Sequence, residues 1–170
     1  MKKLQTYHTD KQLLRKINNN FNTWVLYFIS EGGIHGAIGC AIVSFTLALV
    51  GKLLTTTEVS LMQCIIFWGI CGGIGGMLWG SLVAFRALKS MTKAEKHGIE
   101  AWTGIASTGG IYGILLGTLF ATLSNLIPGR PLLGVHPIIT SFLFLFAGIT
   151  IGVIASRSGF KLFISYISYR

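Results

Sequence analysis

Histidine and cysteine are the side chains in the apolar part of this chain whose types could support chemistry. His35 is the titratable residue that lies deepest in a candidate membrane span, and such residues mark proton or substrate routes. Its position one turn from the membrane edge also fits a hydrogen-bonded interfacial histidine. Cys40, Cys64 and Cys71 lie within candidate spans without a CxxC motif. They are interpreted as small apolar packing residues rather than as a metal or redox site.

Acid–base and phosphate chemistry find no support in the sequence. An intramembrane acid–base enzyme needs a carboxylate or a histidine pair, and the long apolar stretches contain no Asp, Glu, Lys or Arg. A GxGxxG phosphate fingerprint requires a strand–turn–helix setting, which the apolar glycine-rich runs do not provide. The chain is therefore expected not to be an enzyme, and to have no catalytic residue, cofactor or metal site.

The elements that carry these residues are long and uncharged. The chain is 52% hydrophobic and 11% charged, whereas soluble domains have about 25% charged residues. About 20 apolar residues span a bilayer as a helix. We predict an all-α integral membrane domain with four transmembrane helices near residues 32–54, 60–85, 101–126 and 137–156. The predicted division is an amphipathic N-terminal segment (1–31), the four-helix domain (32–156) and an interfacial C-terminal tail (157–170).

Glycines recur at every fourth position within these spans. The stripes are Gly32 and Gly36; Gly72, Gly76 and Gly80; Gly109, Gly113 and Gly117; and Gly148 and Gly152. Residues four apart share a helix face, and small residues let membrane helices approach closely. The pattern predicts glycine-zipper packing, with spans 60–85 and 101–126 as the closest pair. The other two stripes would then remain available to partners.

The glycine motifs also form a repeat. Gly-Gly-Ile-x-Gly begins at Gly32, Gly72 and Gly109, at spacings of 40 and 37 residues, and a degenerate copy begins at Gly148. One interpretation is a packing unit repeated once per helix. The other is coincidence in a glycine-rich apolar chain.

The N-terminal segment carries an apolar helical face formed by Leu14, Ile17, Phe21, Trp24, Val25 and Phe28. This pattern is typical of an amphipathic helix in the membrane interface. The alternative is a helix packed on a partner or on the domain itself.

Basic residues divide unequally between the two sides of the predicted domain. Twelve Lys and Arg residues flank the spans on the side of the termini and residues 86–100, and two lie on the other side. The positive-inside rule places the richer side in the cytoplasm or its organellar equivalent. The net charge of +9 also favours anionic lipid headgroups as partners, and a nucleic-acid role is not expected.

Four helices, GxxxG motifs and a basic loop between the second and third spans resemble the mitochondrial inner-membrane import-channel (Tim-type translocase) family, which includes a respiratory complex I accessory subunit. In the family pattern, an arginine and an aspartate precede GxxxG. Lys96 and Glu100 occupy the charged positions before Gly109 and Gly113, in a frame displaced by one residue. The family's termini face the intermembrane space, whereas the charge distribution here favours the matrix side. The resemblance implies a mitochondrial inner-membrane location; the charges alone also fit a bacterial inner membrane.

Two functions remain open from the sequence. The first is a non-catalytic subunit that packs within and stabilises a larger membrane protein complex. The alternative is a translocator or pore component for a polypeptide or solute. A groove shared between helices and lined by polar side chains would favour the alternative. The candidates are Gln63, Ser81, Thr103, Ser107, Thr108, Thr118, Thr122 and Asn125.

Overall fold

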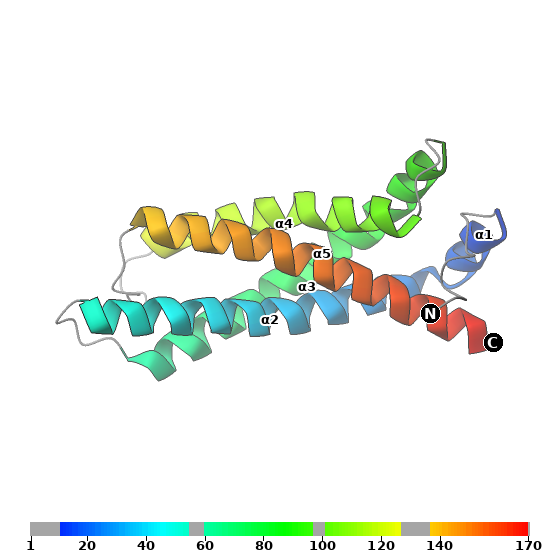
Figure 1. Cartoon of the computed structure of the whole chain (residues 1–170). Coiled ribbons are helices and arrows are strands. Elements are labelled where there is room, and N and C mark those ends of the chain that lie inside the picture. Colours follow the sequence, from blue (N-terminus) through cyan, green and yellow to red (C-terminus); the bar gives the residue numbers. More distant parts are fainter. Residues whose placement is uncertain (1–10, 55–59, 97–100, 127–136, 170) are drawn as a thin grey trace.

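The computed structural model describes residues 11–54, 60–96, 101–126 and 137–169. The regular structure in these ranges is entirely helical. The helices are α1 (Lys11–Asn19), α2 (Phe21–Leu54), α3 (Leu61–Lys96), α4 (Ala101–Leu126) and α5 (Pro137–Tyr169). Figure 1 shows α2 to α5 as long helices and α1 as a short helix beside the start of α2.

Helices α2 to α5 are each long and apolar enough to cross a membrane, and the chain is an integral, multi-pass membrane protein. Three of them exceed the expected spans. α2 begins at Phe21 instead of residue 32, α3 continues to Lys96 instead of 85, and α5 continues to Tyr169 instead of 156. At 1.5 Å per residue these helices are about 50 Å long, against a hydrocarbon core of about 30 Å. The uncharged runs indicate what can lie in lipid, but a flanking Arg or Lys does not end a helix.

The four long helices form a closed ring of neighbours. α2 packs on α3 and α4 packs on α5 most extensively, and the two pairs meet through α2–α5 and α3–α4 contacts. The starts of α2 and α4 and the ends of α3 and α5 lie at one end of the molecule (Figure 1). The first described helix and the end of α5 therefore lie at the same end of the molecule as the end of α3.

Two apolar clusters fill the interior. One contains Trp24, Phe28, Trp79 and Phe163 and also includes Leu13 and Ile17 of α1. The other, near the opposite end, is built around Trp68, Phe120 and Phe144. Large apolar side chains such as Ile42, Ile70, Leu115 and Phe146 are exposed along the helices, as expected for surfaces that face lipid.

Candidate functional site

Glycine backbones form the contact between α2 and α3. A methyl group built on Gly76 would meet the carbonyl oxygen of Gly32, and one on Gly36 would meet the carbonyl oxygen of Gly72. Gly80 approaches the carbonyl of Phe28 in the same way. Neither helix has room for a side chain at these positions, so the two backbones touch directly.

The pair α4–α5 repeats this arrangement. A methyl group on Gly113 would meet the carbonyl oxygen of Gly148, and one on Gly109 would meet that of Gly152. Gly117 faces the backbone of Phe144. The ten glycines singled out in the sequence therefore lie in two separate antiparallel contacts.

This pairing corrects two expectations. Spans 60–85 and 101–126, now α3 and α4, are not the closest pair; α3 packs most extensively on α2, and α4 on α5. The stripes of α2 and α5 are not left for partners, because each meets a stripe within the chain. A glycine stripe specifies a face that admits a backbone, but four stripes of the same kind do not specify which faces meet.

Indole hydrogen bonds join neighbouring helices at the end that carries most basic residues. Trp24 of α2 donates its indole N–H to the carbonyl oxygen of Ala84 on α3, at 2.9 Å. Trp79 of α3 donates to the carbonyl oxygen of Gly109 on α4, at 3.3 Å. Trp24 is fully buried. For Trp24 and Phe28 the structure matches the alternative interpretation of the N-terminal face, in which it packs on the domain itself.

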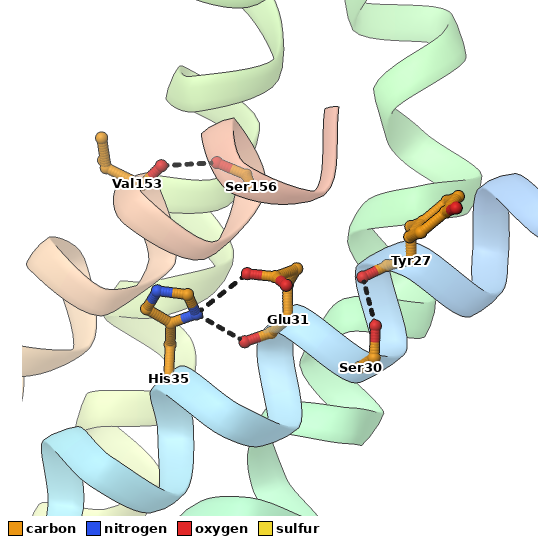
Figure 2. A network of polar contacts seen from close by, with 6 residues as sticks. All are labelled: Tyr27, Ser30, Glu31, His35, Val153 and Ser156. Carbon is orange, nitrogen blue, oxygen red and sulfur yellow. Dashed lines mark hydrogen bonds and ion pairs between the residues drawn. The ribbon is translucent and has the colours of Figure 1, made fainter. Parts of the chain in front are cut away.

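The pair of side chains best suited to chemistry is Glu31 and His35 on α2. Nδ1 of His35 lies 2.9 Å from the carbonyl oxygen of Glu31 and 3.3 Å from its carboxylate Oε2. The carboxylate is 13% exposed and the imidazole 30%. Figure 2 shows the pair on the side of α2 that faces Ser156 of α5.

Sequence reasoning missed Glu31. The uncharged run begins at residue 32, so Glu31 was assigned to a polar N-terminal segment, whereas α2 starts ten residues earlier. His35 is therefore not alone among ionisable groups. The spacing of four residues between Glu31 and His35 was the available signal, because residues at i and i+4 of a helix lie side by side.

The hydroxyl groups proposed to line a groove turn back on their own helices. Ser107 donates to the carbonyl oxygen of Gly104, Thr118 to that of Ile114, and Thr122 to that of Thr118. Thr103, Ser107, Thr118 and Thr122 are all exposed on the outer face of α4.

The remaining groove candidates are distributed over different surfaces. Gln63 is exposed, Ser81 is half-buried and Thr108 is buried. The side chain of Asn125 lies outside the described part of the chain. The candidates that the structure describes therefore do not line a common groove between helices.

A small cavity of about 20 Å³ lies between the two helix pairs. Its lining is apolar and includes Gly32, Trp79, Phe120, Phe144 and Ile151. The volume is close to that of a single water molecule, but the lining is almost entirely apolar, and the indole N–H of Trp79 is already bonded to the carbonyl oxygen of Gly109.

The three cysteines lie in α2 and α3, and none of them forms a disulfide within the described part of the chain. Cys40 fills the space beside Gly72, whose added methyl group would lie 2.8 Å from its Sγ. Cys64 is fully buried. Within the described residues no three His, Cys, Asp or Glu side chains gather as a metal site would require.

Of the residues that carry the family resemblance, Glu100 and the side chain of Lys96 lie outside the described part. Gly109 and Gly113 form the α4–α5 contact. Comparison of the chain with protein-family models, curated proteins and solved structures found no match in any of the three.

Proposed function

We propose that the chain is a non-catalytic, multi-pass membrane subunit that packs within and stabilises a larger membrane protein complex. The observation that carries the proposal is the line of hydroxyl side chains on the outer face of α4. Thr103, Ser107, Thr118 and Thr122 are exposed and share one helical face. Serine and threonine are enriched where membrane helices pack on one another, so this face suits another protein helix.

The arrangement supports a subunit over a translocator or pore. A pore requires polar side chains from several helices to face a common path. Here the four exposed hydroxyls of this face belong to α4 alone, and the small cavity between the helix pairs has an apolar lining. The resemblance to the Tim-type family is compatible with either function and supports a location in the mitochondrial inner membrane; the alternative is a bacterial inner membrane.

The proposal also covers how the subunit is held together and anchored. Glycine-zipper contacts would make each helix pair a stable unit, ready to be covered by partners. The exposed cations Arg86, Lys89, Arg157 and Lys161 would bind anionic headgroups at the richly basic end. We assign the interfacial position to this end, where the N-terminal segment and the C-terminal tail meet.

Site-specific photocrosslinking tests the proposed face in native membranes. A photoreactive residue replaces Ser107 or Thr118 on α4, with Ile42 on α2 as a control. Ile42 is 60% exposed within its span and lies outside the hydroxyl face. We expect defined protein adducts from positions 107 and 118 and lipid adducts alone from position 42. Loss of the chain should also reduce the amount of the complex identified by the adducts.

Absence of protein adducts from α4, together with solute flux through the isolated chain in liposomes, would overturn the subunit proposal. Dependence of that flux on Ser107 or Thr118 would favour the pore.

A further inference from the structure

The two halves of the chain share one helix arrangement. Gly32 of α2 corresponds to Gly109 of α4, 77 residues later, and Gly72 of α3 corresponds to Gly148 of α5, 76 residues later. Each half folds into an antiparallel helix pair, so the two contacts that join the pairs, α2–α5 and α3–α4, occupy equivalent places in the repeat. The repeat therefore allows these two contacts to be compared residue by residue.

In the α3–α4 contact, α3 contributes a glycine and α4 contributes the side chains that cover it. A methyl group built on Gly75 would lie 2.9 Å from Cζ of Phe120 and 3.2 Å from Cδ1 of Leu116. Gly75 is buried and Leu116 is half-buried. The side chain of Leu116 and the ring of Phe120 thus occupy the space that a side chain at position 75 would need.

In the α2–α5 contact, the glycine is on α2 and the covering side chain is on α5. A methyl group built on Gly39 would lie 2.7 Å from Cγ1 of Ile151 and still closer to its Cδ1. At the repeat offsets, Gly39 corresponds to Leu116 and Gly75 corresponds to Ile151. Both contacts therefore combine a glycine with a branched aliphatic residue, and in both the glycine belongs to the α2–α3 pair.

This distribution of sizes affects which helix pairs can meet. Two copies of the α2–α3 pair would place Gly39 opposite Gly75 and leave a void, which forfeits dispersion attraction. Two copies of the α4–α5 pair would place Leu116 opposite Ile151, where two side chains would compete for the space of one. Lipid provides no hydrophobic drive between helices, so the fit of their surfaces weighs heavily in their association. The four residues favour contact between unlike pairs over contact between like pairs.

A third set of positions shows the same complementarity in the opposite direction. Here α2 supplies the large side chain, Phe28, and α5 supplies Gly159, whose added methyl group would lie 3.4 Å from Cγ of the Phe28 ring. The repeat positions are Ile105 of α4 and Val83 of α3, and both are fully buried. Two α2–α3 pairs would bring Phe28 opposite Val83, which overfills the space. Two α4–α5 pairs would bring Ile105 opposite Gly159, which underfills it.

We propose that side-chain size at these repeat positions makes the inner face of the α2–α3 pair a selective docking surface for the α4–α5 pair. Gly39 and Gly75 are the specificity-determining residues of the first pair, and Leu116 and Ile151 are those of the second. The surface accepts a helix pair that carries branched aliphatic side chains at both positions, and it disfavours a second copy of the α2–α3 pair. It lies on the inside of the ring, so the proposal does not depend on the hydroxyl face of α4.

Variants of the α2–α5 contact test the proposal in the full chain. Ile151→Gly reproduces the glycine–glycine combination of two α2–α3 pairs, and Gly39→Leu reproduces the leucine–isoleucine combination of two α4–α5 pairs. The double variant Gly39→Leu/Ile151→Gly reproduces the combination found at Leu116 and Gly75. As a control, Ile154→Gly replaces Ile151→Gly, singly and together with Gly39→Leu, because Ile154 lies on the same helix and is 48% exposed. Thermal unfolding in detergent compares the melting temperature of each variant with that of the wild type.

We expect Ile151→Gly to lower the melting temperature by at least about 4 °C, because the lost side chain leaves a void. Gly39→Leu should lower it by at least about 2 °C through overpacking. The double variant should melt at least about 3 °C above the temperature expected if the two shifts simply added. The shifts of Gly39→Leu and Ile154→Gly should add without such a gain.

Should a single variant fail to fold, recovery of a folded Gly39→Leu/Ile151→Gly chain would be the equivalent supporting result. Additive shifts in that double variant, its failure to fold, or an equal gain in the Ile154→Gly control would overturn the proposal.

Discussion

Replacing Gly76 with alanine should separate α2 from α3, whereas the same change at Gly73 should not. A methyl group on Gly76 would lie 2.7 Å from the carbonyl carbon of Gly32 and would be still closer to its oxygen. At Gly73, one turn earlier on α3, the nearest atom would be Cβ of Ala37 at 3.5 Å. Both glycines face α2, so the pair of variants isolates the backbone contact from the general effect of replacing glycine.

The size of the effect follows from these distances. Carbon atoms pack best at about 3.5–4.0 Å, so Gly76→Ala requires the backbones to move apart by about 1 Å. A gap of 0.5–1 Å removes a quarter to a half of the dispersion attraction between facing atoms, and overpacking typically costs about 1–3 kcal/mol. Gly73→Ala should change the free energy of unfolding by no more than about 0.5 kcal/mol.

Thermal unfolding in detergent with a thiol-reactive fluorophore measures this difference. Cys40 and Cys64 are buried thiols that form no disulfide among the described residues, so reaction with the dye reports loss of the folded state. Each kcal/mol corresponds to a shift of about 2–4 °C for a chain of this size, and we expect Gly76→Ala to melt below Gly73→Ala by at least that amount. Equal melting temperatures for the two variants would show that the α2–α3 backbone contact does not determine stability.

Two further outcomes are expected. Trp24→Phe removes the donor that binds the carbonyl oxygen of Ala84 and should cost about 1 kcal/mol. Trp68→Phe removes a buried N–H that has no hydrogen-bond partner among the described residues, so it should cost less in the same melting assay; the reverse order would contradict the assignment. Cysteines introduced at positions 5, 93 and 165 should react with an impermeant thiol reagent from one side of the membrane, and those at 56 and 130 from the other; opposite-side labelling of 93 and 165 would contradict four spans.

The number and type of the spans could be predicted because lipid imposes a simple requirement. A backbone in the hydrocarbon core must satisfy its hydrogen bonds internally, so an uncharged run of about 20 residues predicts a helix. The helix ends could not be predicted in the same way. Residues 21–31 and 157–169 continue α2 and α5 because apolar side chains there, such as Trp24 and Phe163, pack into a shared cluster.

The candidate site was only half visible in the sequence. His35 stood out because it lies inside an uncharged run, while Glu31 was excluded by being the residue at which that run stops. The helix, not the charge pattern, brings the two side chains together, since one turn separates them. A boundary defined by the absence of charge necessarily assigns the first charged residue to the outside, even where its carboxylate is mostly buried, as it is here at 13% exposure.

Which glycine stripes pair with each other depends on what the other faces of each helix contact. α3 uses Gly76 against α2, but Gly75 of the same helix faces Phe120 of α4, at 2.9 Å from an added methyl group. One face of α3 thus meets a backbone and the adjacent face receives an aromatic ring. The α3–α4 interface is therefore made by side chains, while the α2–α3 and α4–α5 interfaces are made by backbones. Because backbone contacts admit no added atom and side chains can repack, we expect each helix pair to behave as a rigid unit and adjustments to partners to occur between the pairs.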